Sequence, residues 1–271
     1  MLLINKKCPN CGGYYDPTLK KCPHCYKSNE LYLNRQISNN ILFLHPLAQV
    51  GIFLVGFAFA GMLIAEIIFS IFASVIKDND LLRSTVILSA TYFSMFIGLL
   101  CIPLTTRRKE FLSKYKRPID YIYGIAYAIT IVLMSMALST LISLFHNVGD
   151  NANQTAVISV SKNYPILAFF IFGLIGPICE ELTYRVGLYS LFRRINKYLA
   201  FAITMIVFAF IHFDFESFTN GNLVEELWSI PSYLLSGLML TIAYEHRGPA
   251  CSMTAHMAYN TFALLMILAA K

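Results

Sequence analysis

Two adjacent glutamates and an arginine four residues further on lie in an otherwise apolar stretch of the sequence. They are Glu180, Glu181 and Arg185, and no charged residue precedes them for more than a dozen positions. On a helix, the spacing of four lets Glu181 and Arg185 pair along one face. Glu180 then points about 100° further round, toward whatever the neighbouring elements enclose. A carboxylate in an apolar pocket holds its proton more tightly and suits general acid–base work on water, so this motif favours hydrolysis.

Two further pairs of residues have the same spacing of four. Phe208 is followed by His212, and His256 is followed by Asn260. Each spacing places two side chains one helical turn apart on the same face. A histidine beside a glutamate can help to orient the attacking water. A second histidine with an amide one turn away supplies donors of the kind that stabilise an oxyanion.

Each motif also has a structural interpretation. A lone buried histidine is more often a hydrogen-bonding residue than a catalyst. A Glu–Arg pair four apart is usually structural even within a membrane, because the two charges satisfy each other. Two histidines and two glutamates are also a donor set for a metal site of zinc type, although the sequence contains no His-Glu-x-x-His helix. The joint occurrence of three motifs on three separate apolar segments favours a functional site.

The elements that must position these residues are membrane helices. Of the 271 residues, 57% are hydrophobic and 13% are charged, and the mean hydropathy is +0.60. Charged residues make up about 25% of an average soluble domain. The sequence therefore predicts an all-α polytopic membrane protein with a transmembrane domain at residues 46–271. Seven spans are expected, at residues 46–76, 84–104, 119–145, 164–192, 198–213, 228–244 and 251–270.

Basic residues are distributed unevenly between the loops of this arrangement. With the amino terminus inside, the inner loops at 105–118, 193–197 and 245–250 contain ten Lys and Arg residues and the outer loops contain three. This asymmetry predicts a multi-pass protein of the cell membrane with a cytoplasmic amino terminus. No apolar segment begins before residue 41, so no cleavable signal peptide is expected. From the rise along each helix, we expect Glu180, His212, His256 and Asn260 to line one cavity in the inner half of the bilayer.

Four cysteines precede the first expected span. Cys8 and Cys11 form one Cys-x-x-Cys pair, and Cys22 and Cys25 form a second. Two such pairs close together are the ligand set of a zinc ribbon, so residues 1–28 are predicted to bind one structural zinc ion through the four thiolates. Two disulfides or unligated thiols are the alternatives, and His24 inside the second pair is expected to be a bystander. Residues 29–45 form a polar linker, and reduced thiols agree with a cytoplasmic location.

Taken together, the three intramembrane motifs resemble those of the CAAX-protease and bacteriocin-processing (CPBP, or Abi) family of intramembrane proteases. The resemblance covers roughly residues 120–270. The family patterns E-E-x-x-x-R, F-x-x-x-H and H-x-x-x-N match, in order, Glu180, Glu181 and Arg185, then Phe208 and His212, then His256 and Asn260. One departure is that Val186 separates Arg185 from Gly187, where many members have Gly directly after the Arg.

This resemblance implies roles for the matching residues. Glu180 and His212 would activate the attacking water, and His256 and Asn260 would form the oxyanion site, with Glu181 and Arg185 in the same catalytic set. Members cleave prenylated proteins near the carboxyl terminus in eukaryotes, and in bacteria they are linked to processing of small secreted peptides or immunity to them. The family has been described both as metalloproteases and as metal-free, glutamate-dependent enzymes, so an active-site metal stays open.

The leading hypothesis is an intramembrane endopeptidase that cuts a membrane-bound peptide or a lipidated tail. The alternative, from a different class, is a non-proteolytic membrane scaffold or bacteriocin self-immunity protein with the same fold. A transporter with a proton relay is disfavoured, because the two halves lack paired, interrupted helices. The expected partners are membrane lipid and a membrane-bound substrate. Nucleic acid is not expected, since the net charge of +6 is explained by membrane topology.

Overall fold

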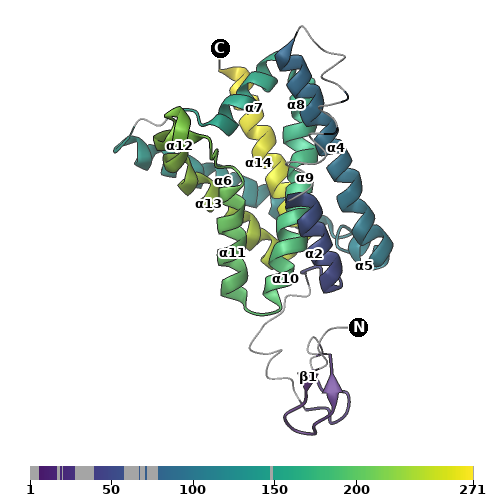
Figure 1. Ribbon diagram of the computed structural model, residues 1–271. Coiled ribbons are helices and arrows are strands. Elements are labelled where there is room, and N and C mark those ends of the chain that lie inside the picture. The colour runs from purple at the N-terminus through teal and green to yellow at the C-terminus, as the bar shows by residue number, and fades with distance from the viewer. Residues whose placement is uncertain are drawn as a thin grey trace. The chain divides into compact units, whose positions relative to one another are not determined.

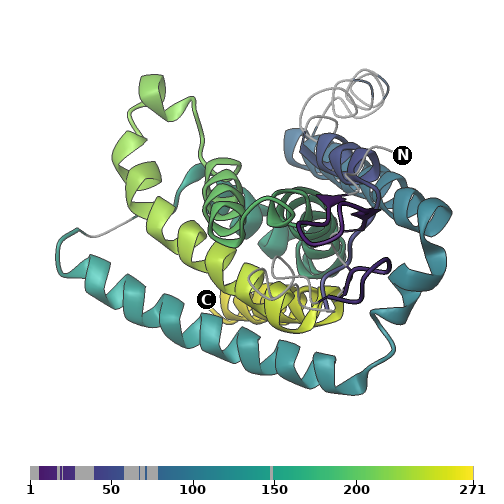
Figure 2. The same cartoon turned by 90° about the horizontal axis from the view of Figure 1, so that it is seen from below.

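The computed structural model describes residues 6–16, 19, 21–27, 40–57, 67, 71, 79–146 and 149–270. The chain divides into two compact units, Met1–Asn39 and Asn40–Lys271. Each unit is described by itself below. Figure 1 shows the ribbon of the whole chain, and Figure 2 shows it from below.

The first unit is a small cysteine-bearing module built on two tight turns. Strands β1 (Lys6–Lys7) and β2 (Tyr14–Tyr15) pair antiparallel. Each Cys-x-x-Cys pair is followed by a residue with positive φ, Gly12 at 73° and Tyr26 at 56°. The backbone N–H of each of these residues donates to the carbonyl of the first cysteine of its own pair, at 2.9 and 2.8 Å. The two turns therefore have the same backbone geometry.

The second unit is helical throughout its described residues. Its long helices carry most of the apolar sequence, and short helices connect them. In chain order they are α2 (Pro46–Leu54), α4 (Asp80–Thr106), α5 (Arg108–Ser113), α6 (Pro118–Ser143), α7 (Ala152–Asn163), α8 (Pro165–Ala168), η2 (Phe169–Ile175), α9 (Gly176–Glu180), η3 (Glu181–Tyr189), α10 (Ser190–Arg193), α11 (Lys197–Phe210), α12 (Ser217–Asn220), α13 (Leu223–Arg247) and α14 (Pro249–Ala269). The expected all-α polytopic class is confirmed.

Five of these helical segments are long and apolar enough to cross a membrane. They are α4, α6, the continuous run Pro165–Arg193, α13 and α14. The other two expected spans are not confirmed as such. In the described residues they correspond to shorter apolar helices, Pro46–Phe57 and Lys197–Phe210. Most of the rest of the first expected span, with the lone intramembrane acid Glu66, lies outside the described residues.

Local sequence signals set the ends of these helices. Asn79 and Asn196 cap α4 and α11 by accepting hydrogen bonds from backbone N–H groups in the first turn. Proline occupies the first turn of α6 and of α14, where no N–H is needed. The break between α13 and α14 falls at Gly248, whose φ is 87°. A Cβ at this position would lie 2.4 Å from the Asn40 carbonyl oxygen, so only glycine fits here.

The run Pro165–Arg193 lies at the centre of the packing. Half of its most apolar window is buried, a larger share than in the other four spans. Helix α2 packs on η3, and α14 packs on α6, η2 and α9. Figure 2 shows α6 along one side of this unit with α13 beside it. The segment that carries the glutamates thus contacts α2, α4, α11, α13 and α14.

The two ends of the second unit differ in charge. The connections after α4, α10 and α13 meet at one end, here called the basic end, and those after α6 and α11 meet at the other, here called the acidic end (Figure 1). At the acidic end, the connecting residues 144–151 and 211–226 contain five carboxylates and no Lys or Arg. At the basic end, Arg193 pairs with Glu245 at 2.9 Å, and Arg117 pairs with the buried Asp120 at 2.7 Å.

Helix α7 was not expected. The expected spans leave residues 146–163 as a mostly polar outer loop, but residues 152–163 form a helix at the acidic end. Asn151 caps it by accepting the Gln154 N–H. The buried Glu226 at the start of α13 accepts the Ala152 N–H at 3.0 Å and the Asp214 N–H at 3.2 Å. These bonds fix α7 against α13.

Candidate active site

The helix that carries the two glutamates is wound more loosely than an α-helix. Glu180 ends the short α9, and Glu181 begins the π-helical η3. Pro177, at the start of α9, has no N–H to donate and so interrupts the hydrogen-bond ladder just before them. The hydroxyl of Ser190, the first residue of α10, donates to the Arg185 carbonyl of η3 at 2.9 Å. Such π-helical turns are frequent at functional sites.

Glu181, Arg185 and His256 form a buried charged cluster. Arg185 Nη1 lies 3.0 Å from Glu181 Oε1, and His256 Nδ1 lies 2.9 Å from the same oxygen. Arg185 Nη2 also donates to the Gly237 carbonyl at 3.2 Å, and its guanidinium lies 4.6 Å from the centre of the Phe208 ring. Because an ionised carboxylate only accepts hydrogen bonds, His256 Nδ1 carries a proton. The cluster and its contacts therefore join η3 to α11, α13 and α14.

Glu180 has a different environment from its neighbour. Its side chain is 16% exposed, whereas that of Glu181 is 1% exposed. Glu180 Oε2 lies 3.6 Å from His256 Nε2. His256 thus bridges the two glutamates, with one ring nitrogen toward each. The histidine that the structure places against Glu180 is His256, so this pair of side chains differs from the Glu180–His212 pair that the resemblance implies.

His212 lies just beyond the end of α11, in the turn that follows Phe210. Its Nδ1 lies 2.8 Å from the Phe208 carbonyl oxygen. Since a carbonyl can only accept, Nδ1 carries the proton and Nε2 of the neutral ring keeps a free lone pair. The ring is stacked on Tyr233, with centroids 4.5 Å apart, and lies 4.9 Å from the Phe208 ring. His212 is therefore held in one orientation and one tautomer.

Asn260 is positioned by a backbone carbonyl of η2. Its Nδ2 donates to the Phe172 carbonyl at 3.0 Å. A side-chain amide has two N–H groups and an oxygen, so one donor and one acceptor remain for the cavity. Asn260 and His256 lie one turn apart on α14, as their spacing predicts.

One cavity of about 620 Å³ brings these groups together. Glu180, His212, His256 and Asn260 all line it, whereas Glu181 and Arg185 lie behind its wall. The expectation that these four side chains line one cavity is therefore confirmed. The cavity extends past His146 and Asp150 to Trp228, and so reaches the acidic end.

Three contributions to this site were missed in the sequence. Tyr233 stacks on His212, and its hydroxyl accepts hydrogen bonds from the Asn151 and Asn153 side chains, each at 3.1 Å. Helix α7 forms part of the cavity wall. Helix α2 packs closely on η3, where a Cβ on Gly187 would lie 3.0 Å from the Phe53 backbone nitrogen. For the packing of α2 on η3, the small residue Gly187 was the one signal in the sequence. Neither Tyr233 nor α7 belongs to a recognisable sequence pattern.

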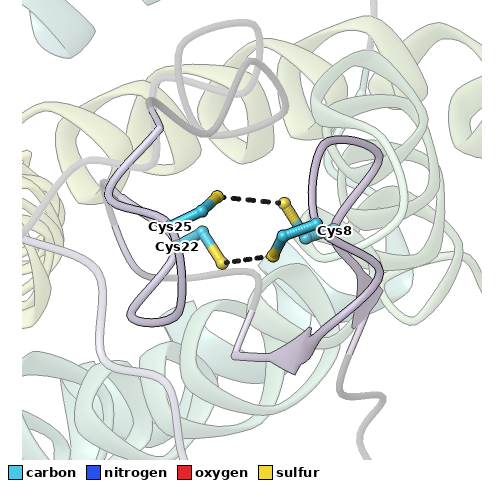
Figure 3. Close-up of side chains that lie close together, drawn as sticks. Cys8, Cys22 and Cys25 are labelled. Carbon is cyan, nitrogen blue, oxygen red and sulfur yellow. Dashed lines mark hydrogen bonds between the residues drawn. The ribbon is translucent and has the colours of Figure 1, made fainter.

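The four cysteines of the first unit form a second cluster. Their sulfur atoms all lie within 4.8 Å of one another. The Sγ atoms of Cys8 and Cys25 are 3.8 Å apart, and those of Cys11 and Cys22 are 3.7 Å apart (Figure 3). A disulfide bond is about 2.05 Å long, so all four are free thiols, as are the other three cysteines. Among the described residues, this is the one group of three or more Cys, His, Asp or Glu whose ligand atoms are close enough to hold a metal.

The local bonding of this cluster favours thiolates at two positions. A hydrogen bond from the Asn10 side chain lowers the pKa of Cys25 to about 6, and backbone amides of its own turn lower the pKa of Cys8. His24 does not take part, since its Nε2 lies 3.0 Å from the Tyr14 carbonyl. The cluster is therefore made of sulfur ligands alone.

Comparison with known proteins supports the resemblance. Residues 162–262 match the family model of the type II CAAX prenyl endopeptidase Rce1-like proteins. The chain is 28% identical over 159 residues to the UPF0177 protein YvdC of Lactococcus lactis subsp. lactis, covering 58% of this chain and 56% of that protein. It is 29% identical over 163 residues to the UPF0177 protein YajF of the same organism, covering 56% of this chain and 73% of that protein.

A third relative is an uncharacterized protein of Mycoplasma capricolum, 25% identical over 157 residues, which are 54% of this chain and 44% of that protein. The chain thus spans little more than half of the YvdC protein and less than half of the Mycoplasma protein. No solved structure matches the chain. The matched residues 162–262 contain all three motifs, so the family model and the motif pattern agree over this part of the chain.

Proposed function

We propose that this protein is an intramembrane endopeptidase that hydrolyses a peptide bond in a membrane-associated substrate. The observation that carries the proposal is the shared cavity. Four polar side chains line one space of about 620 Å³: Glu180 of α9, His212 of the turn after α11, and His256 and Asn260 of α14. The match to an endopeptidase family over the same residues supports it.

In this proposal, Glu180 is the general base. It takes a proton from a water molecule as the water oxygen attacks the peptide carbonyl carbon. The carbonyl oxygen becomes an oxyanion, toward which Asn260 and His256 supply donors. When the C–N bond breaks, Glu180 returns the proton to the leaving amine. The free lone pair of His212 Nε2 accepts a hydrogen bond from the same water and orients it.

The buried cluster adds a reason for the motif to contain two glutamates. Glu180, Glu181 and Arg185 together would carry one net negative charge, which is costly in an apolar interior. A protonated His256, whose Nε2 lies 3.6 Å from Glu180 Oε2, would balance this charge. In this proposal, Glu181 orients His256 and neutralises Arg185, and Glu180 is the carboxylate that takes a proton from water.

Replacing Glu180 by Gln tests this function. Glu180→Gln keeps the size of the side chain but removes the base, so peptide cleavage by the purified protein in lipid nanodiscs is expected to fall by roughly 10²- to 10⁴-fold. The matched control is Glu110→Gln, which makes the same chemical change in a surface ion pair with Arg107. Equal cleavage by both variants would contradict the proposal. Full retention of the cellular phenotype by Glu180→Gln would instead favour the scaffold or immunity function.

We also propose that the four cysteines bind one structural zinc ion. A tetrahedral site with Zn–S bonds of about 2.3 Å has sulfur atoms about 3.8 Å apart, and the paired sulfurs here are 3.7 and 3.8 Å apart. The two turns would hold the zinc ion between the sulfur atoms of Cys8, Cys11, Cys22 and Cys25. A bound zinc would supply the cross-link that a module of this size needs to fold. The positive-inside rule places this module in the cytoplasm.

Elemental analysis separates the cysteine cluster from the intramembrane site. We expect one zinc per purified full-length chain and none in a Cys11→Ser/Cys22→Ser variant. A variant that still contains one zinc per chain would place a metal elsewhere, and the metal-free mechanism above would then be wrong.

A further inference from the structure

A tyrosine of α4 lies in the wall of the cavity beside the motif residues. Tyr92 lines the cavity together with Glu180 and Asn260. It belongs to none of the three motifs, and it precedes the matched residues 162–262. The mechanism proposed for the site does not use it. Its role depends on where its hydroxyl lies and on what that hydroxyl can bind.

The ring of Tyr92 is placed against the helix that carries Glu180. Cys179 Sγ donates to the Tyr92 carbonyl at 3.8 Å, which joins α4 to α9. A Cβ on Gly176 would lie 3.5 Å from Tyr92 Cε1, the ring carbon next to the one that bears the hydroxyl. Because Gly176 has no side chain, the hydroxyl end of the ring lies over this position. Gly176 and Glu180 are one turn apart on one face of α9.

Asn260 reaches the same level of this helix from the side of α14. Its Nδ2 donates to the Phe172 carbonyl at 3.0 Å. That carbonyl is available because the Gly176 N–H donates to the Ile171 carbonyl and Pro177 has no N–H. A helix carbonyl points along the axis toward the next turn, so the Asn260 amide lies level with Gly176.

The Tyr92 hydroxyl and the Asn260 amide therefore approach the same turn, one from α4 and one from α14. Phe172, Gly176 and Glu180 follow one another at spacings of four and all line the cavity. The two donors thus lie about one turn from the carboxylate that activates the water in the proposed mechanism. This is the region where the carbonyl oxygen of a substrate attacked by that water would lie.

The proposed oxyanion site is short of donors without Tyr92. Such sites usually combine two donors aimed at the developing charge. His256 Nε2 lies 3.6 Å from Glu180 Oε2, so a proton on that nitrogen faces the carboxylate. Asn260 has one N–H left after its bond to the backbone. The Tyr92 hydroxyl, in contrast, has no hydrogen-bond partner within the part of the chain that the structure describes.

We propose that the Tyr92 hydroxyl is a catalytic hydrogen-bond donor that binds the oxyanion together with the remaining N–H of Asn260. This inference rests on the proposed peptidase function and adds a residue to its active site. The phenol keeps its proton throughout. It stabilises the charge on the former carbonyl oxygen and takes no part in the proton transfer between water and Glu180.

Removing one oxygen atom tests this role. Tyr92→Phe keeps the ring that packs on α9 and removes the hydroxyl. Purified full-length protein in lipid nanodiscs is given a mixture of internally quenched peptides, made with and without an S-farnesyl cysteine. The values of kcat and KM are then measured for a peptide that the wild type cleaves. We expect kcat to fall by about tenfold or more and KM to stay within about threefold, because this hydrogen bond forms in the transition state.

Tyr115→Phe is the matched control. Its hydroxyl donates to Met253 Sδ at 3.2 Å, and Tyr115 does not line the cavity. The same atom is removed from another partly buried tyrosine, so kcat should match the wild-type value. The unfolding midpoint is measured on the same samples, and kcat is expressed per folded molecule. Equal kcat values in the two variants would overturn the role of Tyr92.

The pH profile of kcat is the second readout. Loss of a neutral donor lowers kcat at every pH and leaves the shape of the profile unaltered. A displaced profile would place the hydroxyl on Glu180 as a positioning contact, and would overturn its assignment to the oxyanion. A raised KM with unchanged kcat would make it a contact to the bound substrate, which would also overturn the assignment.

The wild-type protein separates this inference from the function on which it rests. If the wild type cleaves a peptide and Tyr92→Phe cleaves it with the same kcat, the inference is wrong and the peptidase function stands. If the wild type cleaves no peptide of the mixture, the peptidase function itself is contradicted, and this inference with it.

Discussion

His256 is the residue on which the two glutamates depend. Its Nδ1 contacts Glu181 at 2.9 Å, and its Nε2 lies 3.6 Å from Glu180. The imidazole ring of His256 therefore lies between the buried carboxylate of Glu181, which pairs with Arg185, and the carboxylate of Glu180, which lines the cavity. At the scale of single residues, the consequence is a division of roles between neighbours in the sequence, since Glu181 is buried and paired and Glu180 is accessible to water.

Removing the partner of Glu181 is expected to destabilise the protein. Arg185→Leu would leave a buried carboxylate without its cation, at a cost of about 3–5 kcal/mol in the free energy of unfolding. The measurement is denaturant-induced unfolding in detergent. Arg107→Leu is the control, because its pair with Glu110 is exposed and contributes at most about 1 kcal/mol. A similar small loss in both variants would mean that the buried pair does not hold the helix.

Tyr233 is expected to act as a positioning residue for His212. Tyr233→Phe keeps the ring that stacks on His212, whereas Tyr233→Ala removes it. Cleavage by the Phe variant should stay within about threefold of wild type. The Ala variant should lose about tenfold or more in kcat, because the orientation of the imidazole that positions the water then varies. The pH profile of kcat is the second readout, since a change confined to folding would leave its shape unaltered. An Ala variant with unchanged kcat would contradict the role.

At the scale of elements, the π-helical η3 depends on the close approach of α2. Gln49, fully buried on α2, donates to the Val186 carbonyl at 3.4 Å and accepts from Arg194 Nε at 3.0 Å. A Cβ on Gly56 would meet the Thr183 hydroxyl, so this approach also requires a small residue there. The glutamate-bearing helix is thus supported by an element that precedes the matched residues 162–262.

A methyl group at Gly187 tests this support. In Gly187→Ala the new Cβ would lie 3.0 Å from the Phe53 backbone nitrogen, which cannot move aside as a side chain can. We expect a loss of about 1–3 kcal/mol in stability and a fall in cleavage, measured on the same samples. In the control Gly98→Ala, the nearest atom is a Val55 methyl group at 3.6 Å, so this variant should be neutral or slightly stabilised. If Gly98→Ala were less stable than Gly187→Ala, the close packing of α2 on η3 would be contradicted.

The sequence predicted these elements unevenly, for physical reasons. Glu180, Glu181 and Arg185 stood out because charge is rare in apolar segments, and a spacing of four correctly placed Arg185 beside Glu181. That spacing says which residues share a face but not which faces meet, so the contact between Glu180 and His256 was not foreseen. Hydropathy identified five long spans, and the other two expected spans are not confirmed. The span expected at 198–213 corresponds to the shorter helix Lys197–Phe210, and much of the span expected at 46–76 lies outside the described residues. Helix α7 escaped notice because its polar sequence reads as a loop.

At the scale of the whole molecule, the chain consists of two compact units of different chemistry. One is built around four cysteine sulfur atoms that lie close together, and the other is built on apolar packing around a buried ionic cluster. Treatment with a strong chelator is therefore expected to remove zinc and unfold the first unit, since metal binding and folding are coupled in such modules. The second unit should keep its thermal unfolding midpoint within about 2 °C, measured by tryptophan fluorescence of Trp228. A large shift in that midpoint would contradict the independence of the two units.

The first described residues of the second unit have a practical consequence for anyone who wishes to shorten this protein. The Asn40 side chain donates to the His246 carbonyl at 2.6 Å, and the Leu42 N–H donates to the Tyr244 hydroxyl at 3.2 Å. These bonds fasten the beginning of the unit to the end of α13, some two hundred positions later. A fragment that contains only the three motifs would keep Glu180, His212 and His256 but lose α2 and these two hydrogen bonds. The shortest fragment that keeps the second unit intact therefore begins just before Asn40.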